Sequence, residues 1–175
     1  MVISSLEEYI GDDGEYGLLT GAFNPPHRGH VSAPDRAFLQ KPSLRGVAVI
    51  PHNWSRDKNP VSIELRIEWL VKTIKEFSIN PERIVVLRDA ETLGSPDKLD
   101  LICNANRERL FKVVGADRAS SGQRNSAQRI VLPRAYELSS TWVKEAIRSN
   151  EVERMRGEVA ADVLRQIMQL GLYVE

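Results

Sequence analysis

The segment GLLTGAFNPPHRGH, residues 17–30, places two of the chain's three histidines three residues apart, after an apolar run that is typical of a buried strand. Two imidazoles on a turn of small residues and prolines could bind a metal ion, move protons or donate hydrogen bonds to an anion. A metal site needs more ligands, but His52 is the only other imidazole and the single cysteine, Cys103, is remote in sequence. This argues against a metal site, and an idle exposed loop is the alternative to a functional segment.

The small residues of this segment suit a phosphate. Gly21 has no side chain and lets the backbone approach a phosphate closely, and the amides around Ala22 and Phe23 could donate to its oxygens. Gly29 leaves room beside His30. Imidazoles can donate to phosphoryl oxygens where charge develops, and a nearby polyanion favours their protonated form.

Short apolar runs alternate with longer helix-patterned stretches, which predicts βαβ units and a parallel sheet covered on both faces. The expected strands are residues 16–23, 46–50, 84–87, 110–114 and 129–132. The fold class is therefore α/β, a single Rossmann-like doubly wound parallel sheet of about five strands with helices on both faces and a C-terminal helical pair. In such sheets ligands bind beyond the carboxyl ends of the strands, where the chemistry-bearing segments of this sequence lie.

Helices are expected at residues 62–77, capped by Ser62, at 97–110, and in a closing pair at 140–150 and 157–170. Residues 118–128 are polar and rich in turn formers, which predicts a surface loop. Pro34 lies where a helix after His30 should already be running, and Ser32 with Asp35 forms an S-x-x-D start signal. The regular helix could therefore begin late, or begin on time and kink.

Composition limits the class of protein. With 175 residues and 42% hydrophobic residues, one domain covering 1–175 is expected, with 138–175 as its helical C-terminal part. The 24 basic and 24 acidic residues balance, so no overall field recruits nucleic acid or a membrane surface. One cysteine excludes an internal disulfide, no apolar run approaches membrane-spanning length, and an acidic start argues against a signal peptide. A cytoplasmic location is expected, and a homo-oligomer is left open.

The pattern G-x-F-x-P-x-H-x-G-H, from Gly21 to His30, resembles the HxGH signature of the cytidylyltransferase-like nucleotidyltransferase superfamily. These enzymes join a nucleoside triphosphate to a phosphate-bearing acceptor. The resemblance implies that His30 is the main transition-state contact and His27 its companion. Thr20 and the residues around Gly21 and Gly29 would then lie at the nucleotide.

A second segment, LSSTWVKEAI at residues 138–147, resembles the superfamily's distal SSTxxR motif. Ser139, Ser140 and Thr141 stand at a predicted helix start, where free amides and the helix dipole favour phosphates. Lys144 replaces the arginine, so it can neutralise a phosphate but cannot form a bidentate fork, and Arg148 lies one turn further on. An ordinary capped helix is the alternative for this motif alone.

A third segment, VVGADR at residues 113–118, resembles the strand-ending GAD of the nicotinamide and nicotinate mononucleotide adenylyltransferases. The resemblance implies that Gly115 and Asp117 line the nucleotide site, with Asp117 near the ribose and as the one protein candidate for a metal ligand. Asn24, Lys58, Arg66 and Trp54 are the candidates for acceptor binding. The cofactor expected with ATP is Mg²⁺, held mainly by phosphate oxygens.

The expected reaction moves AMP from ATP to nicotinamide or nicotinate mononucleotide and releases pyrophosphate. The acceptor half matches less well, since RDAE puts Ala90 where the nicotinamide-type enzymes have tryptophan, and the Ser-Tyr-Thr stretch of the bacterial nicotinate enzymes is missing. A phosphopantetheine adenylyltransferase, a cytidylyltransferase and a non-catalytic nucleotide-binding relative are the alternatives.

Overall fold

The computed structural model describes residues 1–11, 14–52, 61–88, 96–116, 128–133 and 138–174. Six parallel strands form one sheet in the order β1-β4-β3-β2-β5-β6. Their bounds are β1 Val2–Ile3, β2 Glu15–Gly21, β3 Leu44–Pro51, β4 Ile84–Leu87, β5 Leu110–Gly115 and β6 Arg129–Leu132. The strand order reverses at β2, which pairs with both β3 and β5.

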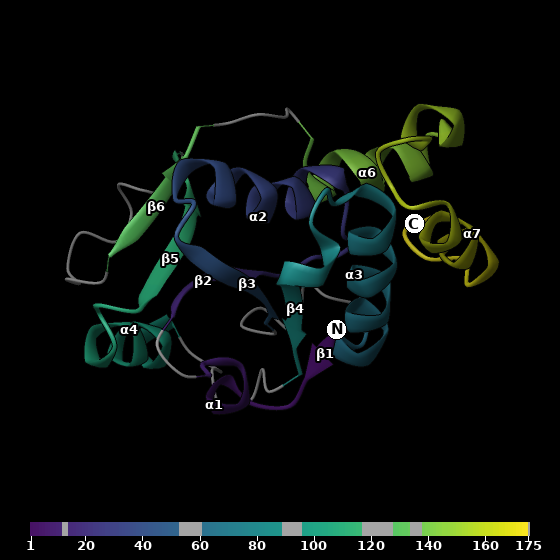
Figure 1. The fold of residues 1–175 in the computed structure, drawn as a ribbon. Coiled ribbons are helices and arrows are strands. Elements are labelled where there is room, and N and C mark those ends of the chain that lie inside the picture. Colours follow the sequence, from purple (N-terminus) through teal and green to yellow (C-terminus); the bar gives the residue numbers. More distant parts are fainter. Residues whose placement is uncertain (12–13, 53–60, 89–95, 117–127, 134–137, 175) are drawn as a thin grey trace.

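Helices cover both faces of this sheet (Figure 1). Helices α2 (Arg28–Gln40) and α3 (Ile63–Phe77) pack on one face through an apolar cluster that includes Val47, Val49 and Leu70. Helices α1 (Leu6–Tyr9) and α4 (Pro96–Ala105) lie on the other face, over Ala48 and Ile50. Successive residues of β3 thus face opposite layers, as the period of two along a strand requires.

The predicted α/β fold and all five predicted strands are confirmed. The sheet has one strand more than expected, because β1 is only two residues long and a two-residue apolar run carries no periodic signal. The helix at 63–77 begins after Ser62, whose hydroxyl accepts the Leu65 N–H, as predicted. The predicted loop at 118–128 lies outside the described residues, apart from residue 128.

Helix α2 corrects the interpretation of Ser32 and Asp35 as a start signal. The helix begins at Arg28 and continues through Pro34 to Gln40, so the regular helix does not begin late. The Ser32 hydroxyl donates to the Gly29 carbonyl inside the helix. The Asp35 carboxylate is buried and accepts hydrogen bonds from the Ser78 hydroxyl and from the N–H groups of Ile79 and Asn80, at 3.0–3.1 Å.

The substitution Asp35→Ala is expected to lower the free energy of unfolding by about 2 kcal/mol, because it leaves the donors of residues 78–80 without their acceptor. Chemical denaturation measures this loss. Asp162→Ala is the matched control, since that exposed carboxylate bonds the exposed Arg165 side chain at 2.9 Å, and a change within about 0.5 kcal/mol is expected. Equal losses in both variants would contradict the role given to Asp35.

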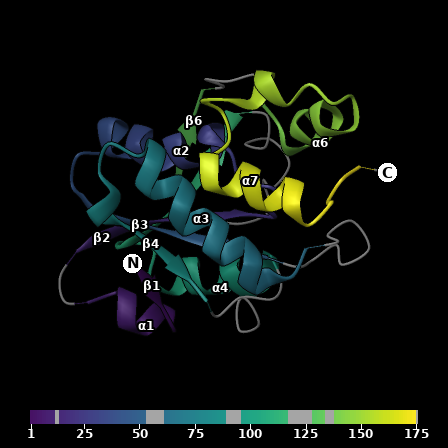
Figure 2. The same ribbon diagram turned by 90° about the vertical axis from the view of Figure 1, so that its right-hand side faces the viewer.

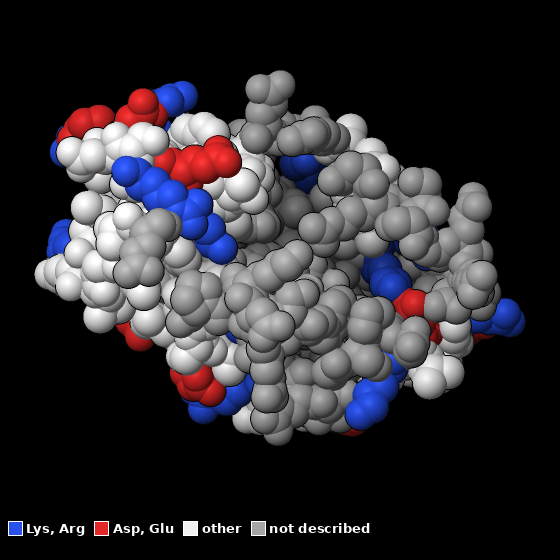
Figure 3. Space-filling model, turned by 180° about the vertical axis from the view of Figure 1, so that it is seen from behind, with Lys and Arg blue, Asp and Glu red and all other residues white. Residues whose placement is uncertain are grey.

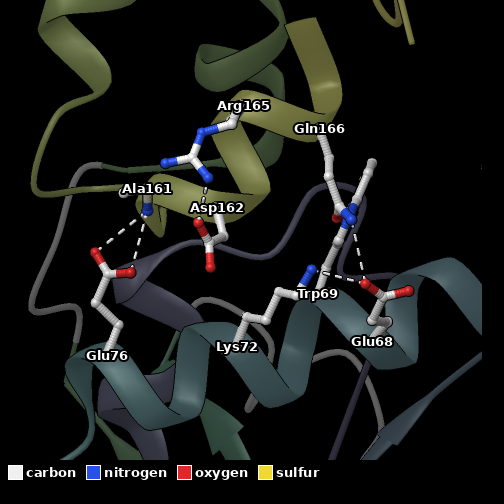
Figure 4. A network of polar contacts seen from close by, with 8 residues as sticks. All are labelled: Glu68, Trp69, Lys72, Glu76, Ala161, Asp162, Arg165 and Gln166. Carbon is white, nitrogen blue, oxygen red and sulfur yellow. Dashed lines mark hydrogen bonds and ion pairs between the residues drawn. The ribbon is translucent and has the colours of Figure 1, made fainter. Parts of the chain in front are cut away.

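Helix α6 (Ser140–Arg148), the 3-10 turn Val152–Met155 and helix α7 (Ala161–Gln169) form a C-terminal helical unit. It packs on the outer side of α3 around Trp69, Val143 and Ile167, and Figure 2 shows α7 running beside α3. A polar network joins these two helices (Figure 4): Trp69 Nε1 donates to Gln166 Oε1 at 2.7 Å, and the Ala161 N–H donates to the Glu76 carboxylate at 3.1 Å. The C-terminal unit is therefore tied to the helix that covers the sheet.

Within the described part of the chain, no helix is long and apolar enough to cross a membrane. Figure 3 shows basic and acidic side chains interspersed on the face turned away from the view of Figure 1, which agrees with the balanced formal charge.

Candidate functional site

A cavity of about 490 Å³ lies at the carboxyl ends of β2, β5 and β6, between the N-termini of α2 and α6. Because β2 and β5 flank the point where strand order reverses, this is where open α/β sheets bind ligands. Predicted site residues from three separate parts of the sequence line it: Thr20, Gly21, Ala22, Phe23, His27, Gly29, His30, Gly115, Ser139, Ser140 and Thr141.

The conformation of the turn after β2 depends on Gly21, which has no side chain. Phe23 has a φ of +47°, in the left-handed region that a residue with a Cβ rarely adopts, and its buried ring folds back over Gly21. A Cβ on Gly21 would lie 2.8 Å from the Phe23 ring. The same ring meets the His30 ring edge-on, with centroids 5.0 Å apart. Gly21 therefore lets Phe23 support His30.

The substitution Gly21→Ala is expected to lower kcat about tenfold, because the new methyl group displaces the Phe23 ring and with it His30. Steady-state kinetics with ATP and an acceptor measures the effect. Gly157→Ala is a control for adding a methyl group at a glycine, since nothing lies within 4 Å of its Cβ position, although its φ of +79° costs stability. The proposed support fails if kcat falls equally in the two variants.

The tautomer of His30 follows from its contact with the start of α2. The backbone N–H of His27 donates to His30 Nδ1 at 3.3 Å. A ring nitrogen that accepts a hydrogen bond carries no proton, so the neutral ring holds its proton on Nε2. His30 lines the cavity from the first turn of α2, so its ring can present an N–H donor to an anion there.

His27 is the N-cap residue of α2 and is 3% exposed. Its ring lies against that of His30 at a tilt of 32°, with centroids 3.7 Å apart, and neither of its ring nitrogens has a hydrogen-bond partner among the described residues. Burial lowers the pKa of His27 to about 4. Buried polar atoms are nearly always hydrogen-bonded, so these two nitrogens need a partner from a water molecule or a bound ligand.

The N-terminus of α6 forms the opposite wall. Ser139 caps the helix by accepting the Trp142 N–H at 3.1 Å, so the helix starts at the predicted residue, Ser140. The Ser140 hydroxyl donates to the Pro25 carbonyl at 3.0 Å, which fixes the helix start against the turn after β2. Amides of the first helical turn and the dipole of α6 therefore face the space beside the two imidazoles.

Four predicted site residues are described but do not line this cavity: Asn24, Arg66, Lys144 and Arg148. Arg66 is fully buried and donates to the carbonyls of Ala22, at 2.6 Å, and His52, at 3.0 Å. Asn24 is also buried, and its Oδ1 accepts from the Tyr173 hydroxyl. These two residues hold the turn after β2 from behind. The predicted acceptor-binding residues Trp54 and Lys58, and Asp117, lie outside the described residues.

Sequence reasoning missed Arg36, whose guanidinium donates to the Pro133 carbonyl and which lines the cavity. Gly29, Ala33 and Arg36 all line the cavity and are spaced i, i+4 and i+7. This spacing places them on one helical face and could have identified Arg36.

Comparison with known proteins places this site in a known fold. No protein-family model matches the chain. A Lactococcus lactis protein described as a "probable nicotinate-nucleotide adenylyltransferase" is 32% identical over 114 residues, which cover 61% of this chain and 56% of that protein. The solved nicotinic acid mononucleotide adenylyltransferase of Plasmodium falciparum, complexed with NaAD, has a TM-score of 0.73 at 11% identity, covering 92% of this chain and 98% of that one.

The fold is that of the nicotinate-nucleotide adenylyltransferases. A Vibrio parahaemolyticus structure described as such an enzyme has a TM-score of 0.66 at 16% identity and covers 93% of this chain and 97% of that one. The Plasmodium enzyme complexed with APC has a TM-score of 0.69 at 11% identity, covering 92% and 98% of the two chains. The shared fold thus spans nearly the whole chain.

Proposed function

We propose that the protein is a nucleotidyltransferase that moves the AMP moiety of ATP to nicotinate or nicotinamide mononucleotide and releases pyrophosphate. The observation that carries the proposal is the buried His27 ring, whose nitrogens have no partner within the described residues, beside His30 and opposite the N-terminus of α6. The similarity to a nicotinate-nucleotide adenylyltransferase and the shared fold support the choice of acceptor.

The reaction needs no general base. The acceptor's phosphate is mostly a dianion at neutral pH, because its second pKa is near 6. The phosphate oxygen attacks the α-phosphorus of ATP in line, a P–O bond to the acceptor forms, and the bond to pyrophosphate breaks. Catalysis then depends on holding two mutually repelling anions together and on stabilising the charge between them.

Different residues at the site bind the transferred phosphoryl group and the leaving pyrophosphate. His30 donates from Nε2 to the transferred phosphoryl group, and His27 donates once a phosphate oxygen gives one of its nitrogens a partner. Amides at the start of α6 hold the leaving pyrophosphate. Lys144 lies on the same helix but outside the cavity lining, and the resemblance assigns the positive charge near the pyrophosphate to this position.

Mg²⁺ is proposed as the companion of ATP and as part of the substrate. Within the described residues, no group of three or more histidine, cysteine, aspartate or glutamate side chains could hold a metal ion. The described lining of the cavity also contains no carboxylate. Those residues fit the phosphates of ATP better than the ion itself, so the ion is assigned to phosphate oxygens.

The proposal is tested by measuring pyrophosphate release from ATP, and separately from CTP, with nicotinate mononucleotide, nicotinamide mononucleotide or phosphopantetheine. Turnover with ATP and a pyridine mononucleotide is expected. Turnover with phosphopantetheine alone would make that compound the acceptor. Turnover with CTP alone would make CTP the nucleotide donor. Tight ATP binding without turnover of any acceptor would show a non-catalytic nucleotide-binding protein. Absence of nucleotide binding would overturn both this alternative and the proposed function.

A further inference from the structure

Tyr173, near the C-terminus, contacts one residue from each of the two segments that carry the candidate site, and both of these residues lie outside the cavity lining. Its side chain is buried, and its hydroxyl donates to Asn24 Oδ1 in the turn that leads from β2 to His27. The Lys144 ammonium of α6 lies over its ring, 5.2 Å from the centroid. One side chain therefore joins the histidine-bearing turn to the cation of the second phosphate motif.

The backbone between the end of helix α7 and Tyr173 forms a turn that places Tyr173 against the residues of the site. Helix α7 ends with the Gly171 N–H on the Met168 carbonyl, at 3.2 Å, and the Leu172 N–H on the Ile167 carbonyl, at 3.1 Å. Gly171 and Tyr173 have φ values of +59° and +66°. A tyrosine adopts such a φ only where its other contacts hold it, so the contacts of its side chain define this conformation.

The contact with Asn24 lies at a structurally important point of the turn. Asn24 follows Phe23, whose ring supports His30, and precedes Pro25, whose carbonyl accepts the Ser140 hydroxyl. Burial raises the pKa of Tyr173, so its hydroxyl keeps its proton and remains a donor to Asn24. The bond therefore holds the turn at a second point, next to the contact between the Ser140 hydroxyl and the Pro25 carbonyl.

The contact with Lys144 explains how a lysine can serve where the resemblance has an arginine. A lysine ammonium is a point charge on a flexible stem, whereas an arginine is oriented by its planar fork. Burial and the neighbouring charge of Arg148 lower the pKa of Lys144. The face of an aromatic ring attracts a cation within about 6 Å of its centroid, and so supplies an orientation that the lysine lacks on its own.

We propose that Tyr173 is a positioning residue for phosphoryl-group binding: its hydroxyl holds the histidine-bearing turn through Asn24, and its ring face holds the ammonium of Lys144 on α6, the helix whose N-terminus lines the cavity. The proposal rests on the proposed function, because it concerns the same site. It predicts that the two parts of the side chain have separable effects.

The hydroxyl is tested with Tyr173→Phe, which keeps the ring. The expected result is a kcat about tenfold lower with an unchanged dissociation constant for ATP, because the misplaced turn affects transfer more than nucleotide binding. Tyr9→Phe is the matched control, since Tyr9 has a buried hydroxyl without a hydrogen-bond partner in the described part of the chain, on the opposite face of the sheet. Equal kcat values for the two variants would overturn this part.

The ring is tested by a double-mutant cycle on ATP binding, measured by calorimetry, with thermal unfolding as the check on folding. Tyr173→Leu is expected to weaken ATP binding about fivefold in the normal background and to have no further effect when Lys144 is already replaced by methionine. The same weakening in both backgrounds would overturn the role of the ring, because it would then act on structure in general.

This design separates the two proposals. If the unchanged protein binds ATP but turns over no acceptor, the proposed function fails while the cycle still decides the role of the ring. If the protein turns over a pyridine mononucleotide and the cycle shows no coupling, the function stands and the role of Tyr173 in holding Lys144 is overturned.

Discussion

Replacing His30 by alanine is expected to lower kcat by about 10²- to 10³-fold, the usual effect of removing one preorganised donor from a developing charge. The physical reason is the tautomer fixed by the His27 N–H, which leaves the proton of the neutral ring on Nε2. Steady-state pyrophosphate release measures the loss, and the dissociation constant for ATP is expected to change by less than about threefold, because the donor acts mainly in the transition state.

A conservative variant separates chemistry from folding. His30→Gln retains an N–H donor of similar reach and is expected to recover about tenfold of the activity that alanine loses. The His30 ring is only half-buried, so both variants should unfold at nearly the same denaturant concentration as the unchanged protein. An alanine variant that loses ATP binding and keeps kcat would instead make His30 a ground-state binding residue.

The sheet was predictable from sequence because its longer strands contain short apolar runs that alternate with amphipathic helices. GVAVI at 46–50 and IVVL at 84–87 are buried on both sides, as interior strands of a parallel sheet must be. Val2 and Ile3 form a strand only because they pair with Val86 and Leu87. That pairing is a tertiary contact, and two residues cannot signal it locally.

The motifs predicted which segments meet at the cavity, but they did not predict the direction of each side chain. Thr20–Phe23, His27, His30 and Ser139–Thr141 converge as expected, since the fold places the ends of β2 and the start of α6 together. Arg66 is a charged residue on a helix, for which exposure is the usual expectation. It is buried instead, because two backbone carbonyls at the ends of β2 and β3 accept its N–H groups.

Asp35 is a second residue whose hydrogen-bond partners could not be predicted from the sequence. Local spacing suggested a helix cap, whereas the carboxylate bonds residues 78–80, which are far away in sequence. A local pattern can identify a residue that bonds backbone N–H groups, but the fold decides which N–H groups these are.

The protein is expected to lose about 3 kcal/mol of stability as the pH falls from about 6.5 to about 4, through His27 alone. The ordinary pKa of histidine, 6.5, describes the unfolded chain, and burial lowers the pKa to about 4 in the folded protein. Between these values the unfolded state binds a proton that the folded state does not, so acid favours unfolding. Well above pH 6.5 the ring is neutral in both states and contributes no pH dependence.

Denaturation in urea at a series of pH values measures this effect, and His27→Gln is the control that removes the titration while keeping a polar side chain. Taking the difference in unfolding free energy between the two proteins cancels the contributions of all other groups. This difference should change by about 3 kcal/mol across the pH range. Saturating ATP is expected to reduce the change, because a phosphate beside the buried ring favours its protonated form and gives its nitrogens the partner that they lack. A pH dependence that is the same with and without ATP would mean that the triphosphate does not reach His27, and the assignment of this ring to the phosphate site would then be wrong.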